Sequence, residues 1–316
     1  MILRQDESPW TVPAPAKLNL YLEVLGRRPD GYHELETLLV PIQLYDSLTF
    51  STNRSASRGE LAPISLDVTV QQSLPTGATA ETPIPIGSEN LVVRALELLR
   101  ERSGCDRGAH VHLVKRIPAA AGLGGGSSDA AAALRLGNRD WGLGWSRDRL
   151  ASLAAELGSD VPFFLSSGPA ICRGRGERIE AITGTVPLHF VVVKPPIGLA
   201  TPDVYRAWDD RSGAEQQDRD LGRASLAQLV AALRRGDFRN LGEWMSNRLQ
   251  AAATQLSPWI DQVRTACTRL DFVTHQLTGS GSAYFGVCRH AQHARRLATI
   301  LRTRQLGLIF TTQSCR

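Results

Sequence analysis

Apolar and polar residues alternate near the N-terminus in the way that a β-strand requires. The apolar positions are Leu18, Leu20, Leu22 and Val24, with mostly polar residues between them. This pattern predicts a strand with one buried face. A turn is expected over 26–31, followed by further strand over 35–50 that is broken at Pro41.

Helical and strand patterns mix along the rest of the chain. Apolar spacing predicts helices over 91–102, 147–157 (capped by Ser146), 225–235, 238–250, 258–269 and 291–303, and one that opens at Thr201-Pro202. Strands are predicted over 64–70, 109–114, 170–182 (a hairpin), 190–193, 283–288 and 307–312. The rest of 51–88 is expected to be an exposed hairpin or a partly mobile loop, and 209–223 a loop. Because helices and strands do not alternate strictly, the predicted fold class is α+β, in two domains that divide near 165–175.

Composition narrows the class of protein. The 316 residues are 42% hydrophobic and 21% charged, which is typical of a soluble protein of about two domains. No run approaches the ~20 apolar residues of a membrane span, and the first residues lack the pattern of a signal peptide. The five cysteines are scattered without a Cys-x-x-Cys pair, which favours reduced thiols in the cytoplasm over a disulfide framework or zinc site.

The basic residues are informative mainly because few of them are lysines. A net charge of +5 permits nucleic-acid binding, but no stretch interleaves basic residues with aromatics, and an anionic small substrate fits equally well. Only three of the 36 basic residues are lysines: Lys17, Lys115 and Lys194. Each either survives by chance or lies where a compact ammonium is needed. Lys17 and Lys115 fall inside motifs, which favours the second interpretation for those two.

The most informative segment runs from 117 to 134 and has four glycines among positions 122–126. Glycine permits positive φ and close approach of the backbone to a ligand. Ser127 and Ser128 are good N-cap residues, and the alanine run after them favours a helix. The free N–H groups at the start of such a helix suit a phosphate. We therefore predict a strand–loop–helix phosphate site; the alternative is a flexible turn that caps a helix.

Two other phosphate motifs are excluded. A Walker loop ends in Gly-Lys-Ser/Thr, whereas Gly126 is followed by Ser127. A dinucleotide fold needs its glycine turn directly after a strand, and here residues 116–121 intervene, although Asp140 and Asp148 lie at a suitable distance along the chain.

Two positions in the first half of the chain carry further candidate chemistry. Lys17 and Asn19 share one face of the first predicted strand, where they would suit a hydroxyl or phosphate; the alternative is a solvated strand edge. Tyr32 and His33 follow an Asp-Gly turn, where they would stack on a nucleobase and bond to its edge, or form ordinary surface.

Two later positions fit the same chemistry. Asp160 either caps a turn or faces Lys17 across a site for phosphoryl transfer, which requires a hydroxyl held in line with the phosphate. Residues 278–282, Thr-Gly-Ser-Gly-Ser, either close over phosphates or form a plain helix-to-strand turn.

In this order, the segments resemble the signatures of the GHMP kinase superfamily. The matching segments are 15–20, 28–33, 122–131, 158–163 and 278–281. The resemblance implies a two-domain fold with the active site in the cleft between an ATP-binding domain, 1–170, and a substrate domain, 171–316. The long phosphate loop together with Asp-Gly-Tyr-His resembles those members that move the γ-phosphate of ATP to the 2-hydroxyl of a cytidine-diphosphate methylerythritol, in isoprenoid precursor synthesis.

The resemblance also implies roles for single residues. Lys17 and Asp160 would be the catalytic pair. Substrate would be held by Asn19, Tyr32, His33, Thr278 and Gly279, with Tyr32 and His33 around the cytosine. ATP would be held by Asn90, Lys115, Pro118, Ala119, Ala120, Ala121, Gly122, Leu123, Gly124, Gly125, Gly126, Ser127 and Ser128. Ser128 also matches a serine that touches Mg²⁺ in related kinases, although the dedicated glutamate of those kinases is missing.

Two departures and two rival functions accompany the resemblance. The 51–88 stretch is longer than usual, and 245–250 matches the usual Asn-Asp-Leu-Glu weakly, so no function is assigned to it. The first rival is a GHMP kinase for another small molecule, such as homoserine or mevalonate, against which Tyr32-His33 argues. The second is a non-catalytic ligand sensor or nucleic-acid binder, against which the presence of both Lys17 and Asp160 argues.

Overall fold

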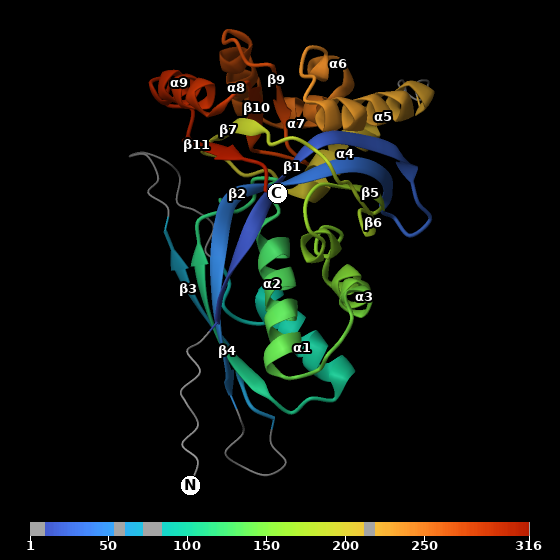
Figure 1. Cartoon of the computed structure of the whole chain (residues 1–316), viewed down its shortest axis with the longest axis vertical. Helices are drawn as coiled ribbons and strands as arrows, with labels where there is room; N and C mark the ends of the chain where they lie inside the picture. The colour runs from blue at the N-terminus through green and yellow to red at the C-terminus, as the bar shows by residue number, and fades with distance from the viewer. Residues whose placement is uncertain (1–9, 54–60, 72–83, 212–218, 316) are drawn as a thin grey trace.

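The computed structural model describes residues 10–53, 61–71, 84–211 and 219–315, with the backbone alone for 219–224. These residues form two β-sheets with helices packed on them (Figure 1), which confirms the predicted α+β class. Of the long stretch 51–88, residues 54–60 and 72–83 lie outside the described residues, so the predicted hairpin or loop there is not addressed. The strand predicted inside that stretch is present as β3 (Ile64–Val70).

A long antiparallel hairpin joins the two halves of the molecule. It consists of β1 (Trp10–Arg27) and β2 (His33–Asn53), paired from Trp10 opposite Phe50 to Arg27 opposite His33. The predicted break at Pro41 is wrong. Pro41 lies inside β2 opposite Lys17, so the strand continues through it. The pairing of β1 with β2 is irregular nearby, where the register shifts between Pro15 and Ala16.

The predicted half-burial of β1 is also wrong. Asn19, Tyr21 and Glu23 are as well buried as the leucines that alternate with them. Both faces of β1 are covered, since the adjacent residues Tyr21 and Leu22 point to opposite faces and belong to two different hydrophobic clusters. Polar residues in this part of the strand are therefore enclosed, where their hydrogen bonds are protected from water.

The first sheet is built around the hairpin in the order β3–β4–β2–β1–β8, and β5 and β6 extend it from β2. The remaining strands are β4 (Gly108–Lys115), β5 (Ala170–Gly174), β6 (Arg178–Ala181) and the two-residue β8 (Ser246–Asn247). Residues 47–53 of β2 pair with β4, and residues 35–39 pair with β5. The predicted hairpin over 170–182 is thus confirmed, and it belongs to this sheet.

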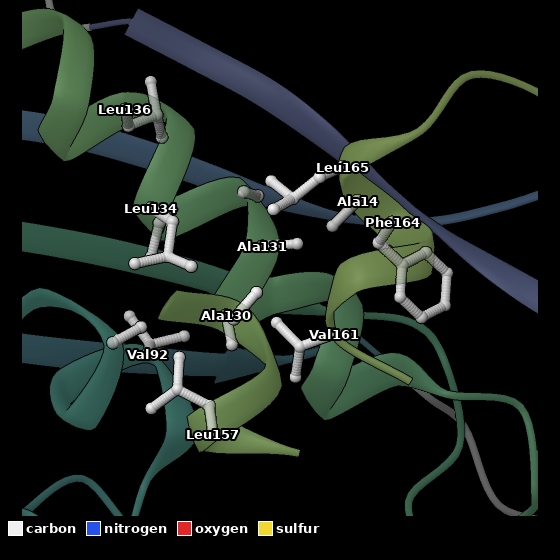
Figure 2. Packing of buried hydrophobic residues seen from close by; sticks show 14 of the residues in the cluster. Ala14, Val92, Ala130, Ala131, Leu134, Leu136, Leu157, Val161, Phe164 and Leu165 are labelled. Atoms are coloured by element: carbon white, nitrogen blue, oxygen red, sulfur yellow. The ribbon is translucent and has the colours of Figure 1, made fainter. Parts of the chain in front are cut away.

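Two helices pack on the first sheet, α1 (Leu91–Ser103) and α2 (Gly125–Asp140). Two further segments, α3 (Arg147–Leu157) and the 3-10 helix η1 (Pro162–Leu165), pack mainly against these helices and each other. Figure 2 shows Ala130 and Ala131 of α2 among apolar side chains of α1, α3, η1 and β1. These alanines are fully buried. Because small side chains allow close packing, α2 lies deep in the fold with its N-terminus fixed.

The second sheet has the order β11–β7–β10–β9. Its strands are β7 (His189–Lys194), β9 (Thr274–Leu277), β10 (Tyr284–Cys288) and β11 (Leu308–Gln313). The helices of this half are α4 (Thr201–Arg211), α5 (Arg219–Arg235), α6 (Leu241–Trp244), α7 (Gln250–Leu256), α8 (Pro258–Thr268) and α9 (Ala291–Arg302). Figure 1 shows this half above the first, with the hairpin running between them.

Two predictions for this half are wrong, and one strand of the second sheet was missed. The helix predicted over 238–250 is three pieces, because α6 ends at Trp244 and β8 intervenes before α7. The loop predicted over 209–223 is helical in its described parts, since α4 extends to Arg211 and α5 begins at Arg219. Strand β9 was missed, because its four residues carry no alternation strong enough to detect.

The division into domains 1–170 and 171–316 stays a prediction. The hydrophobic residues gather in three clusters, one under α1–α3 and two around the second sheet, and β1 contributes to all of them. Since β5 and β6 pair with β2, a boundary after β6 keeps both strands with the first sheet, although β8 joins that sheet from beyond this boundary.

Candidate active site

A cavity of about 940 Å³ lies where the two halves meet. Of the residues predicted for ATP and substrate, all but Ser128 and Thr278 line it. Those two are buried just behind it, at 2% and 0% exposure. The cavity also takes residues from α4, among them Tyr205 and Asp209, which sequence reasoning missed. Aromatic residues at 205 and 208 on one predicted helix are the signal that would have pointed there.

The glycine loop leads from β4 into α2 as predicted, but its serines do not cap the helix. The N-cap is Gly124, in the left-handed region at φ 73°, and α2 begins at Gly125. Ser127 and Ser128 therefore lie in the first turn, where Ser128 donates its N–H to the carbonyl oxygen of Gly124 at 2.9 Å. The N–H groups of the helical residues before Ser128 have no acceptor within the helix and lie at its positive dipole end. They are placed to bind an anion in the cavity.

Loops from both halves meet closely at this point. A Cβ on Gly122 would lie 2.4 Å from the carbonyl oxygen of Thr278, and one on Gly124 would lie 3.0 Å from Cγ of Lys17. The N–H of Lys17 donates to the carbonyl oxygen of Leu123 at 2.9 Å, and that of Ala283 to Ala121 at 3.0 Å. The glycines are required here because a side chain would separate the loops.

Lys17 and Asp160 are brought together across the cavity. Nζ of Lys17 lies 3.4 Å from Oδ2 of Asp160, and it donates to Oδ1 of Asn19 at 2.7 Å. The lysine side chain is 5% exposed and the aspartate 35%. An enclosed ammonium is thus paired with a carboxylate that stays accessible from the cavity, which is the arrangement needed to orient a hydroxyl.

Asn19 is itself held from both halves. Its backbone N–H donates to Oγ1 of Thr278 at 3.0 Å, and that hydroxyl donates back to Oδ1 of Asn19 at 3.1 Å. Nδ2 of Asn19 donates to Oγ1 of Thr37 at 2.9 Å. The position of the amide, and through it that of Lys17, is therefore set by strands distant in sequence.

The predicted nucleotide residue Lys115 lies between two buried carboxylates. Its ammonium donates to Oδ2 of Asp46 and, at 2.7 Å, to Oδ2 of Asp129. Burial lowers the pKa of Lys115, but the two carboxylates outweigh it and the net shift is upward. Burial raises the pKa of Asp129 to about 7, opposed by Lys115 and reinforced by Asp46. This buried group of three residues joins β2 and the end of β4 to the N-terminal part of α2.

Asp46 also holds the start of the phosphate loop, a role that sequence reasoning missed. Its Oδ1 accepts the backbone N–H of Arg116 at 2.5 Å and that of Ile117 at 2.9 Å. An acidic residue within a predicted strand was the available signal.

Asn90, predicted near ATP, caps α1 by accepting from the N–H of Val92 at 2.9 Å, and donates to the carbonyl oxygen of Pro85 at 2.7 Å. It lines the cavity as well.

An aromatic group closes the far end of the cavity. The ring of His33 stacks on Tyr205 with centroids 4.7 Å apart, and its Nε2 lies 2.7 Å from Oδ1 of Asp209. Tyr32 is 53% exposed, and the guanidinium of Arg175 lies 4.8 Å from its ring centroid. Aromatic faces and polar edges of this kind suit a planar base.

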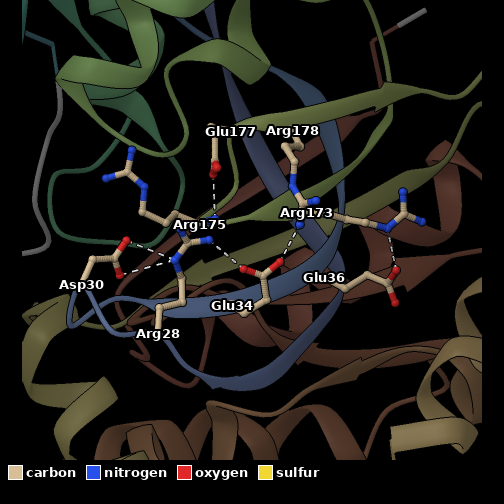
Figure 3. A network of polar contacts seen from close by, with 8 residues as sticks. All are labelled: Arg28, Asp30, Glu34, Glu36, Arg173, Arg175, Glu177 and Arg178. Atoms are coloured by element: carbon tan, nitrogen blue, oxygen red, sulfur yellow. Dashed lines mark hydrogen bonds and ion pairs between the residues drawn. The ribbon is translucent and has the colours of Figure 1, made fainter.

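A network of charged side chains supports the turn that carries Tyr32 and His33. Figure 3 shows Arg28 joined to Asp30 and Glu34, and Glu34 joined in turn to Arg178 of β6. Arg173 of β5 binds Glu36 at 2.8 Å in the same way. The turn between β1 and β2 is thereby fixed against the β5–β6 hairpin.

Two kinds of feature are missing from the described residues. Among the described residues, no helix is long and apolar enough to cross a membrane. Within the same ranges, no three His, Cys, Asp or Glu side chains form a group able to hold a metal ion.

Comparison with known proteins agrees with this geometry. Residues 90–168 match the model of the GHMP kinase N-terminal domain, and residues 229–305 match that of the GHMP kinase C-terminal domain. The first match contains the glycine loop and Asp160, which confirms the resemblance drawn from the sequence. A solved homoserine kinase from Cytophaga hutchinsonii, at 17% identity and a TM-score of 0.73 over 100% of this chain and 97% of that one, shows the shared fold.

Closer relatives narrow the family. The 4-diphosphocytidyl-2-C-methyl-D-erythritol kinase of Pelotomaculum thermopropionicum is 40% identical over 95% of this chain and 96% of its own. That of Moorella thermoacetica is 40% identical over 92% and 94%. A solved 4-(cytidine 5'-diphospho)-2C-methyl-D-erythritol kinase is 36% identical, covers 97% of this chain and 100% of its own, and has a TM-score of 0.74. The chain therefore belongs to the 4-diphosphocytidyl-2-C-methyl-D-erythritol kinase family of the GHMP kinases.

Proposed function

We propose that this enzyme transfers the γ-phosphate of ATP to the 2-hydroxyl of 4-diphosphocytidyl-2-C-methyl-D-erythritol, a step of the non-mevalonate route to isoprenoid precursors. The observation that carries the proposal is the pairing of Lys17 with Asp160, 3.4 Å apart, where the glycine loop and residues 278–281 meet. The binding partner of the enzyme would be this small molecule, rather than a nucleic acid or a membrane. The free cysteines fit a cytoplasmic enzyme.

Lys17 and Asp160 are the proposed catalytic pair. The carboxylate of Asp160 would accept a hydrogen bond from the substrate hydroxyl and then its proton. The ammonium of Lys17 would stabilise negative charge on the transferring phosphoryl group, whose transition state is spread over its oxygens. Asn19 fixes the ammonium by accepting from it at 2.7 Å, so the charge is in place before reaction begins.

The phosphates of ATP would lie on the first turn of α2. Gly124, Gly125, Gly126 and Ser127 line the cavity there with free first-turn N–H groups. Lys115 would contribute positive charge from beneath the loop, together with its role between Asp46 and Asp129.

Mg²⁺, when bound, would neutralise phosphate charge. Ser128 fits as its protein ligand because its buried hydroxyl has no hydrogen-bond partner among the described residues. Since those residues offer no metal-binding cluster, most of the other ligands would come from phosphates and water.

The cytidine end would lie in the aromatic part of the cavity. Tyr32 and His33 would contact the base, with Tyr205 behind His33. Asn19, Thr278 and Gly279 lie nearer Lys17 and would position the methylerythritol portion. A homoserine or mevalonate kinase would have no use for this aromatic group, and a non-catalytic ligand sensor or nucleic-acid binder would have no use for the Lys17–Asp160 pair.

A substrate panel tests the function directly. With ATP, we expect the purified enzyme to phosphorylate the cytidine-diphosphate substrate and to leave homoserine and mevalonate unreacted. Product formation is followed by ³¹P nuclear magnetic resonance and by coupled measurement of ADP. Turnover of homoserine or mevalonate in place of the cytidine compound would contradict the proposal, as would binding without turnover.

Gly124→Ala should weaken ATP binding. The new Cβ would lie 2.9 Å from Cζ of Phe164 and 3.0 Å from Cγ of Lys17, so the loop must move. We expect KM for ATP to rise by about 10-fold, equivalent to about 1.4 kcal/mol. Gly142→Ala is the matched control, because Gly142 has a similar φ of 69° with nothing within 4 Å of the added Cβ. Both variants should lose about 1–2 kcal/mol of stability from backbone strain, and Gly124→Ala should lose more because its Cβ also meets Phe164 and Lys17. Equal KM values for ATP in both would contradict a phosphate role for the loop.

Asp160→Asn should fold normally and lose turnover. The exchange is nearly isosteric, and we expect kcat to fall by roughly 10²–10⁴-fold with little change in either KM, because the carboxylate acts mainly in the transition state. Steady-state kinetics measures this. Asp261→Asn, on the exposed surface of α8, is the control and should keep wild-type kcat. A kcat for Asp160→Asn close to that of the control would refute the assignment.

His33→Ala should affect only the cytidine substrate. The change removes the stacking partner of Tyr205 and the contact with Asp209. We expect KM for the cytidine substrate to rise by about 10-fold while KM for ATP stays within about twofold, since lost ground-state binding raises KM first. His110→Ala, on β4, is the control. A selective rise in KM for ATP would show that the two ends of the cavity are assigned the wrong way round.

A further inference from the structure

The segment 246–250, which sequence analysis left without a function, lies between β1 and the C-terminal glycine loop. Ser246 and Asn247 pair in parallel with Tyr21 and Leu22 of β1. The N–H of Arg248 continues this pairing by donating to the carbonyl oxygen of Leu22 at 3.0 Å. The segment is thereby attached to the strand that carries Lys17 and Asn19.

Side chains of the same segment reach the glycine loop. Nδ2 of Asn247 donates to two carbonyl oxygens, that of Leu277 at 2.9 Å and that of Gly279 at 2.8 Å. Oδ1 of Asn247 accepts the N–H of Leu249 at 3.0 Å, and Oε1 of Gln250 accepts the N–H of Leu277 at 2.8 Å. β9 is the edge strand of the second sheet, so its outer backbone groups have no neighbouring strand to pair with. The side-chain amides of Asn247 and Gln250 supply hydrogen bonds to Leu277 in place of such a strand.

The backbone that Asn247 holds lies against the catalytic residues. A Cβ on Gly279 would lie 3.2 Å from Nζ of Lys17 and 3.3 Å from Oδ1 of Asn19. Gly279 has a φ of 56°, and a glycine peptide rotates with little hindrance. The backbone at Gly279 therefore lies directly beside the hydrogen bond between Lys17 and Asn19, and a shift of this backbone would disturb that bond.

We propose that Asn247 is a positioning residue for phosphoryl transfer. By fixing the carbonyl oxygens of Leu277 and Gly279, it holds the glycine loop in place beside Lys17 and Asn19, so that the ammonium keeps its geometry toward Asn19 and Asp160. Thr278 is held in the same stretch of backbone, so its hydroxyl stays in place on Asn19. This inference rests on the proposed roles of Lys17 and Asn19. It gives the segment 246–250 an effect on turnover without contact with either substrate.

Asn247→Asp tests the proposal, because it preserves shape and removes both donors. Asn138→Asp is the matched control. Nδ2 of Asn138 donates to the carbonyl oxygen of Trp145 at 3.1 Å and its Oδ1 accepts the N–H of the same residue at 2.9 Å, at the far end of α2. We expect a similar shift of the urea midpoint for the two variants. Only Asn247→Asp should lower kcat, on the order of 10- to 100-fold, with KM for both substrates nearly unchanged.

A double variant separates positioning from general loss of structure. If Asn247 acts through Lys17, Asn247→Asp added to Lys17→Ala should lower kcat no further than Lys17→Ala alone. Multiplying losses would overturn the proposal, and so would a kcat for Asn247→Asp equal to that of Asn138→Asp. Asn247→Ala, which adds no charge, replaces Asn247→Asp in each comparison if the latter does not fold.

Two further variants complete the experiment. Gln250→Glu keeps the oxygen that accepts from Leu277, so we expect it to retain wild-type kcat; a loss equal to that of Asn247→Asp would contradict the specific role of the Asn247 donors. Lys17→Ala alone tests the proposed function. Retained turnover there would refute the catalytic assignment itself, whereas loss in Lys17→Ala with normal turnover in Asn247→Asp would refute only the inference.

Discussion

The structure depends on one strand that belongs to both halves of the molecule. β1 pairs with β2 along its whole length and contributes to all three hydrophobic clusters. Lys17 lies near its middle, where the surroundings change from the first sheet to the second. A lysine at that point is enclosed from both sides, so its ammonium must find partners within the protein, and Asn19 and Asp160 supply them.

Close packing of backbone explains why glycine is needed on both sides of this lysine. Gly124 approaches Lys17 from the first half and Gly279 from the second. Each has a positive φ, so a side chain would add both steric conflict and backbone strain. The two glycine loops are therefore a single structural unit, although more than 150 residues separate them in the chain.

Buried charge performs a different task beneath the phosphate loop. Asp46, Lys115 and Asp129 are all less than 10% exposed, and together they tie β2, β4 and α2 to one another. A buried ammonium between two carboxylates is costly to assemble, and removing one partner leaves the others uncompensated. This arrangement favours geometric precision at the start of α2, where the phosphates are proposed to bind.

The sequence by itself determined the local features of the protein. The glycine spacing and the alanine run predicted the phosphate loop and α2, and the short motifs at 15–20, 28–33 and 278–281 indicated the family. Such motifs can be recognised from the sequence because each consists of neighbouring residues. Tertiary structure decided what depends on distant partners. It buried both faces of β1, carried β2 through Pro41, divided 238–250 into three pieces and brought Asp46, Tyr205 and Asn247 to the site. No local pattern encodes these features, since each depends on residues that are distant in the sequence and meet only when the chain has folded.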